Sequence, residues 1–130
     1  ITNKDDIISF YIDYYQFTGG AHGITNRVAY NIDVATGNEL KLEDIFKKDF
    51  LYKDVINNEI SRQIKKDPDR YFTGKDGFNG INENQNFYIK NKKLVIYFEL
   101  YEIAPYASGI SEFVIPNKII KENMKYYEVL

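Results

Sequence analysis

Apolar and polar residues alternate in two stretches near the start of the chain, and a period of two is typical of β-strands. The apolar positions that share a face are Ile8, Phe10, Ile12 and Tyr14 in the first stretch and Val28, Tyr30, Ile32 and Val34 in the second. Asn31 and Asp33 lie opposite, so we expect both strands to be half-buried on their apolar faces. A glycine-rich link at residues 18–23 predicts that the two strands pair antiparallel.

A helical pattern follows the strands. After a turn at residues 35–38, residues 41–46 suit one helical turn that places Leu42, Ile45 and Phe46 in the core. Apolar residues then recur every four positions, at Tyr52, Ile56, Ile60 and Ile64, which predicts an amphipathic helix lying on a sheet. Asp49 is positioned to cap this helix, and Pro68 should end it near Asp67.

The second half of the chain predicts more strands. Residues 74–86, rich in glycine and asparagine, should form a loop before strands at 87–90 and 94–100, which are joined through Asn91 and Lys92. A proline and a glycine interrupt residues 101–109, which we call the hook, before strand 113–115 and a short helix from Pro116. The order predicts an α+β fold: a mostly antiparallel sheet with one long amphipathic helix and short helices packed on one face.

Composition limits the class of protein. The 130 residues are 44% hydrophobic and 28% charged, which fits one globular domain spanning residues 1–130. Lys and Arg number 17 against 19 Asp and Glu, so no nucleic-acid partner is expected. The longest apolar run has five residues, so no membrane insertion by this domain is expected. A start without Met or a signal-peptide layout predicts a fragment of a longer protein.

The chemistry available to the chain is limited. Because it has one histidine and no cysteine, we expect no zinc site, no cofactor and no catalytic set. His22 could act as a base with Ser108 and with Asp33 or Glu102, but no nucleophile-elbow pattern accompanies them. The alternative is that His22 binds a strand end or a hook carbonyl and holds two loops together.

An oxygen-rich cluster occupies the 74–86 loop, comprising Asp76, Asn79, Asn82, Glu83 and Asn84. Calcium is bound by such oxygens, yet these residues lack the spacing of a known calcium loop. We therefore expect a solvated turn and no metal site.

Tyrosine and phenylalanine are abundant, at 12 and 9 residues, and tryptophan is absent. Most of these rings should serve the core. The hook is the exception, because acidic and aromatic side chains surround Pro105 there, namely Glu99, Tyr101, Glu102, Tyr106 and Glu112. Such a patch could meet a basic protein or stack on sugar, and the alternative is simple loop closure.

Three stretches together resemble a known family: YQFTGGAHG at residues 15–23, YNID through LEDIF at 30–46, and YEIAPYASG at 101–109. They are similar to the C-terminal domain shared by RsiV-type anti-sigma factors and PdaC-type peptidoglycan deacetylases, long catalogued as a domain of unknown function. The resemblance runs from Ile8 to Ile120.

This resemblance implies an extracytoplasmic, mostly bacterial module without established catalysis of its own. In the anti-sigma branch the domain is a lysozyme receptor, and in the deacetylase branch it accompanies a separate catalytic domain. The Asp and His metal set of a polysaccharide deacetylase has no counterpart here. Family members usually carry an upstream companion subdomain, and no matching strands precede Ile7.

The leading hypothesis is a non-catalytic recognition or sensory module of the cell envelope whose ligand is a lysozyme-like protein or peptidoglycan. Its candidate ligand-binding residues are Gly19, Gly20, His22, Tyr101, Glu102, Pro105 and Tyr106. One rival is a hydrolase of envelope polymers with His22 as base, and another is a structural spacer. The sequence leaves the oligomeric state open.

Overall fold

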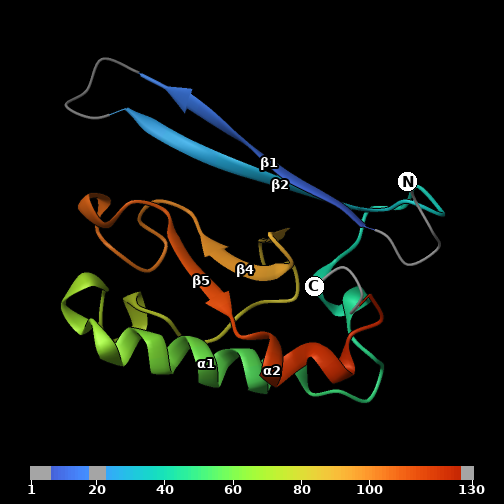
Figure 1. Ribbon diagram of the computed structural model, residues 1–130. Helices are drawn as coiled ribbons and strands as arrows, with labels where there is room; N and C mark the ends of the chain where they lie inside the picture. The colour runs from blue at the N-terminus through green and yellow to red at the C-terminus, as the bar shows by residue number, and fades with distance from the viewer. Residues whose placement is uncertain (1–6, 18–22, 127–130) are drawn as a thin grey trace.

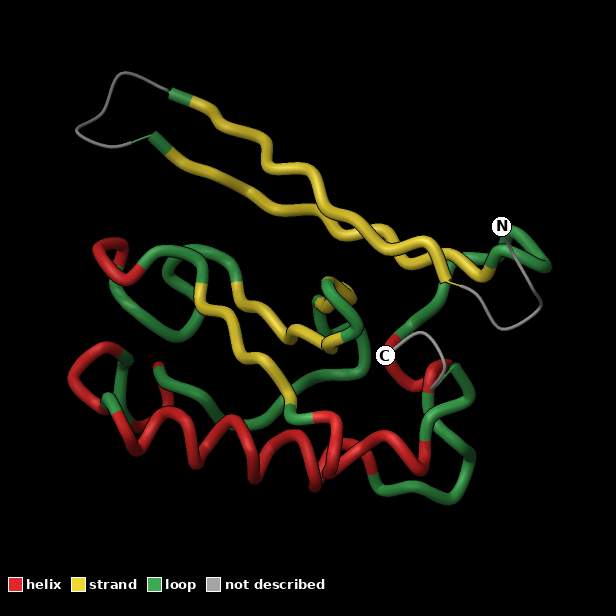
Figure 2. Tube along the Cα trace, viewed as in Figure 1, coloured by secondary structure: helices red, strands yellow, loops and turns green. Residues whose placement is uncertain are grey.

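The computed structural model describes residues 7–17 and 23–126. Within these residues the fold has three layers: a long antiparallel hairpin, a three-stranded antiparallel sheet beneath it, and helices on the far side (Figures 1 and 2). The hairpin is β1 (Ile7–Gln16) and β2 (Ile24–Asp33), the sheet is β3 (Phe87–Lys90), β4 (Lys93–Phe98) and β5 (Ser111–Ile115), and the helices are α1 (Tyr52–Lys66) and α2 (Asn117–Ile120). The predicted α+β class is confirmed, although the strands form two sheets instead of one.

The central sheet is covered on both faces along β3 and β4. Toward the helices it contributes to the main core, which includes Ile56 and Ile60 of α1. Its residues on that side are Phe87, Ile89, Leu94, Ile96, Phe98, Phe113 and Ile115. Toward the hairpin, Tyr88, Val95 and Tyr97 form a smaller cluster with Tyr11 and Ala29. The hairpin is therefore the second cover of the sheet.

The hairpin presents the opposite face from the one predicted. Most residues expected to be half-buried are exposed, with exposed fractions of 50% for Ile8, 44% for Phe10 and 41% for Ile12. In β2, however, Tyr30 and Ile32 are half-buried as predicted, as is Val34 directly after the strand. Asn31 and Asp33, placed opposite the apolar face, are buried. The alternation located both strands and their antiparallel pairing, but the assignment of the inner face was wrong.

Hydrogen bonds explain why polar side chains occupy the inner face. Asn31 Nδ2 donates to the carbonyl oxygen of Phe87 at 2.9 Å, and the amide of Ile89 donates to Ser9 Oγ at 2.7 Å. Ser9 Oγ in turn donates to Asn31 Oδ1 at 2.6 Å. These side chains thus satisfy backbone groups at the free edge of β3, which would otherwise be buried without partners.

The helical segments follow the predicted pattern with one correction. Leu42, Ile45 and Phe46 are buried around a 3₁₀ turn at Leu42–Ile45, as predicted. Helix α1 ends at Lys66, directly before the Asp67–Pro68 pair. Its N-cap residue is Leu51, not Asp49, and no side chain caps it. The helix is held by burial of its apolar stripe against the sheet.

The turn between β3 and β4 is the predicted one. Asn91 and Lys92 both adopt positive φ, at 53° and 61°, as the two central residues of a tight hairpin do. The preceding 74–86 segment is mostly loop, with one 3₁₀ turn at Gly74–Asp76. The last helix was predicted to begin at Pro116, but α2 begins at Asn117 and Pro116 is its N-cap residue.

Candidate functional site

The hook connects β4 to β5 and is fixed at its centre by two buried residues, Ile103 and Ala104. It opens on a tight turn in which the amide of Glu102 donates to the carbonyl of Glu99 at 3.1 Å. The amide of Glu99 donates to Glu102 Oε1 at 2.9 Å and closes the turn a second time. Tyr101, the third residue of the turn, has φ of 67° and is 54% exposed.

A positive φ at this position is normally adopted by glycine or asparagine. A bulky aromatic residue there is uncommon, because its Cβ crowds the backbone. The surrounding hydrogen bonds hold Tyr101 in that conformation while its ring stays exposed. Its ring lies near that of Tyr106, with ring centroids 5.7 Å apart.

The hook also contacts the start of β2. The Tyr106 hydroxyl donates to the carbonyl oxygen of Gly23 at 2.9 Å. Gly23 is buried under the ring of Tyr15, and a Cβ at this position would overlap that ring. The hook and the last residue of the glycine-rich link are thus side by side. Gly19, Gly20 and His22 themselves lie outside the described residues.

The base of the hook is tied to the segment after α1. Ser108 Oγ donates to the carbonyl oxygen of Arg70 at 2.8 Å, and Arg70 Nη2 donates back to the carbonyl oxygen of Ser108 at 3.1 Å. The amide of Phe72 donates to the carbonyl of Ile103 at 2.8 Å. The hook is therefore anchored from two sides and holds its aromatic residues in place.

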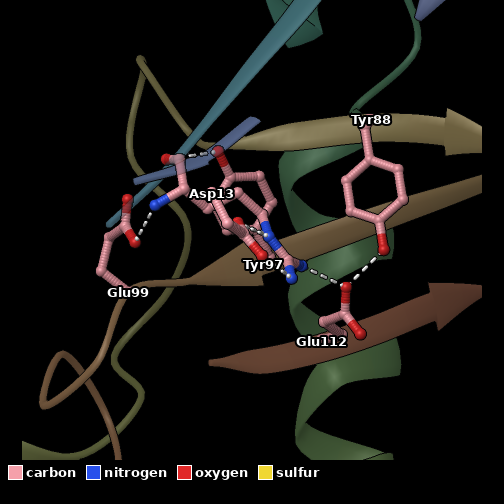
Figure 3. A network of polar contacts seen from close by, with 6 residues as sticks. Asp13, Tyr88, Tyr97, Glu99 and Glu112 are labelled. Atoms are coloured by element: carbon pink, nitrogen blue, oxygen red, sulfur yellow. Dashed lines mark hydrogen bonds and ion pairs between the residues drawn. The ribbon is translucent and has the colours of Figure 1, made fainter. Parts of the chain in front are cut away.

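An arginine with a largely covered side chain joins the hairpin to the sheet beside the hook, and Figure 3 labels the acidic and tyrosine residues around it. The Arg27 side chain is 10% exposed. It donates to Asp13 through Nε at 2.8 Å and through Nη2 at 3.1 Å, and Nη1 donates to Glu112 of β5 at 2.5 Å. Its guanidinium lies 3.9 Å from the ring centroid of Tyr11.

The backbone of Arg27 is held as firmly as its side chain. Its amide donates to Glu99 Oε1 at 3.0 Å, and the Tyr97 hydroxyl donates to its carbonyl oxygen at 3.1 Å. The Tyr88 hydroxyl donates to Glu112 (Figure 3). We call this set of residues the polar junction: Tyr11, Asp13, Arg27, Tyr88, Tyr97, Glu99 and Glu112.

The polar junction shifts the pKa values of its members. Burial alone would lower the pKa of Arg27, but its hydrogen bonds to Asp13 and Glu112 raise it above the ordinary value, so the guanidinium stays charged. Burial, aided by the negative charge of Glu99, raises the pKa of Tyr97 to about 12. Burial and the bond to Glu112 raise the pKa of Tyr88. These phenols therefore stay neutral and serve as donors.

One residue proposed as a partner of His22, Asp33, lies far from the hook, whereas Ser108 and Glu102 both belong to it. Asp33 lies at the end of β2 remote from Gly23, about 30 Å away at the rise of an extended strand. Its carboxylate binds the amides of Ala35 and Thr36 and the hydroxyl of Tyr126. No group of three or more acidic or histidine side chains within 7–17 and 23–126 could hold a metal ion.

The polar junction was missed in the sequence. Its members come from all five strands and from the segment after β4. Glu99 and Glu112 were expected to belong to the hook patch, and each of the others alone is typical of a core tyrosine or a surface charge. One indication was available, because Asp13 and Arg27 face each other when the two alternating stretches are paired antiparallel. Among the ten cross-strand pairs of β1 and β2, this pair is the one that joins opposite charges.

The fold and this surface define a class of protein: an α+β domain that holds an exposed aromatic and acidic loop above a doubly covered sheet. The chain belongs to the DUF3298 family, described as a protein of unknown function, which matches residues 43–118. Residues 1–25 match a second family, described as deacetylase PdaC. The resemblance drawn from the three sequence stretches is therefore confirmed.

Two Bacillus subtilis proteins are similar over 91% of this chain. The anti-sigma-V factor RsiV is 31% identical, and the peptidoglycan-N-acetylmuramic acid deacetylase PdaC is 28% identical. The chain spans 49% of RsiV and 26% of PdaC. This homology supports an envelope-associated accessory domain.

Solved structures agree with the fold. A DUF3298-family protein from Bacteroides fragilis superposes with a TM-score of 0.69 at 30% identity, covering 91% of this chain and 48% of that one. A DUF3298-family protein from Pseudomonas aeruginosa gives 0.62 at 19% identity, over 91% of this chain and 55% of that one, which shows the shared fold alone.

In the part of the chain that the structure describes, no helix is both long enough and apolar enough to span a membrane.

Proposed function

We propose that this chain is a non-catalytic recognition module of an extracytoplasmic envelope protein, and that the hook contacts its ligand. The homology to RsiV and PdaC supports the envelope setting. The separation of Ser108 and Asp33 supports a binding role over hydrolysis, because it removes the acid from one version of the proposed triad.

The single observation that carries this proposal is Tyr101. Glycine would adopt the positive φ of this position with less backbone strain than tyrosine does. A polar side chain would also interact with water more favourably than an exposed aromatic ring does. The chain instead keeps a 54% exposed aromatic ring there, next to the ring of Tyr106. Backbone strain of this kind concentrates at binding sites, where the rest of the structure enforces it.

The chemistry of the hook favours a basic protein ligand. Glu102 and Pro105 are exposed beside Tyr101, so the surface combines negative charge with apolar rings. Aromatic residues supply most of the affinity in protein interfaces, and charge mainly raises the rate of association. A lysozyme-like protein, which the family resemblance suggests, has the required positive charge. Gly19, Gly20 and His22 stay predicted ligand-binding residues and lie outside the described residues.

The test is a Tyr101→Gly variant assayed for binding to hen egg-white lysozyme by biolayer interferometry. Glycine suits the positive φ, so the free energy of unfolding should stay equal or rise. Binding should weaken about tenfold or more, since the aromatic anchor is lost. Tyr14→Ser, which removes a similarly exposed ring from the hairpin, is the matched control and should leave the affinity unchanged.

Equal binding by the Tyr101→Gly variant and the unchanged chain would refute the role of the hook. Binding to purified peptidoglycan instead of lysozyme, with the same loss in the variant, would keep the hook and change the ligand. Turnover of a glycan or ester substrate that His22→Ala abolishes would favour the hydrolase. If the unchanged chain binds neither of these ligands nor any envelope fraction, the result favours the hypothesis of a structural spacer.

A further inference from the structure

The outward face of the β1–β2 hairpin is apolar and carries no charge. Five cross-strand pairs share this face: Ile8 with Ile32, Phe10 with Tyr30, Ile12 with Val28, Tyr14 with Asn26, and Gln16 with Ile24. The rings of Phe10 and Tyr30 stack on it with centroids 5.1 Å apart. Six of its large apolar side chains are exposed, from 39% at Val28 to 51% at Tyr14, while Tyr30 and Ile32 are half-buried.

Charge is distributed in the reverse of the usual way for a covering hairpin. Its three charged residues, Asp13, Arg27 and Asp33, all lie on the face turned toward the rest of the domain. A sheet with one solvated face normally carries polar residues on that face. Contiguous exposed apolar surface in a soluble domain marks an interaction site. The hairpin therefore has two packing faces, and only one has its partner in the described structure.

The family matches indicate what packs on the second face. The DUF3298 match covers residues 43–118, whereas β1 belongs to the stretch 1–25 that matches the PdaC family. Twenty-five residues with one strand are too few to build a core, so a module of that family needs further chain. The relatives and the Bacteroides structure have that chain, since this sequence spans about half or less of each.

We infer that the outward face of the hairpin is the interface between this domain and the rest of a PdaC-type module in the full-length protein. The hairpin then packs on both of its faces: the polar face contacts β3, and the apolar face contacts the companion module. A second copy of this chain is the competing occupant, because an uncharged face can also pair with itself.

The test places one substitution in two contexts. Ile12→Lys is made in the 130-residue chain and in the full-length protein, and thermal unfolding is measured for both. In the short chain the lysine stays in solvent, so the melting temperature should shift little. In the full-length protein it enters an apolar interface, and the melting temperature should fall by roughly 5–10 °C. Val114→Lys, an exposed apolar residue of β5, is the control and should have equally small effects in both.

The mass of the 130-residue chain in solution, measured by light scattering, distinguishes the companion module from a second copy as the occupant of this face. A monomer, together with the context-dependent loss for Ile12→Lys, supports the inference. A dimer that Ile12→Lys dissociates assigns the face to a second copy and overturns it. An equal shift from Ile12→Lys in both contexts, or an equal loss from Val114→Lys in the full-length protein, overturns it as well.

Discussion

Arg27 is the residue on which the attachment of the hairpin depends most. One side chain binds carboxylates from β1 and β5 and lies on the ring of Tyr11, while its backbone is bonded by Glu99 and Tyr97. A guanidinium suits this role because its planar donors satisfy two acceptors at once and its face stacks on aromatic rings. Lysine would supply only a point charge.

Replacing Arg27 with methionine should therefore lower the free energy of unfolding by about 2–3 kcal/mol, below the cost of breaking a fully buried pair. The loss is limited because Asp13 and Glu112 are partly exposed and can be hydrated. Urea denaturation measures it. Lys53→Met, which breaks the exposed contact with Glu83, should cost less than about 0.5 kcal/mol. Equal effects would contradict the role given to Arg27.

At the scale of elements, the positions of the strands and helices were predictable because they depend on local periodicity. The face of the hairpin was not, because the choice depends on partners distant in sequence. In the sequence, Asn31 is typical of a solvent-exposed position. Only the fold shows that it is buried and donates to a carbonyl of β3. The polar junction was not predicted either, because its members are also distant in sequence. The hook was predicted from its own composition and from the family resemblance.

The turn between β3 and β4 offers a prediction for one element. Lys92 adopts φ of 61° in a hairpin turn where glycine is favoured after Asn. Lys92→Gly should raise the free energy of unfolding by about 0.5–1 kcal/mol by removing that strain. Lys93→Gly, one residue on and inside β4, should lower it by a similar amount. A shift of the urea midpoint in the same direction by both variants would contradict this prediction.

For the whole molecule, the three layers depend on neutral tyrosines between the hairpin and the sheet. Tyr97 is fully buried there, and its pKa is raised to about 12 from an ordinary 10 by burial and by Glu99. The unfolded state loses this proton first as the pH rises. The stability from this group is thus complete below pH 10 and is lost between about pH 10 and 12.

Unfolding in urea at several pH values tests this. The unchanged chain should lose on the order of 2–3 kcal/mol of stability from Tyr97 across that range. Tyr97→Phe should be less stable near pH 8, where the bond to the Arg27 carbonyl is missing, and should lose less above pH 10. Parallel pH profiles for the two proteins would show that the junction does not depend on this phenol.

The side chains that seal the central sheet also protect it from association. On β3, Ser9 and Asn31 occupy the Ile89 amide and the Phe87 carbonyl, and on β5 Gln63 of α1 donates to the Val114 carbonyl at 2.9 Å. An open strand edge is a template for adding a strand from another molecule, and it starts many aggregates. At these positions both borders of the sheet are already occupied. Detachment of the hairpin would thus uncover an aggregation-prone edge as well as weaken the fold.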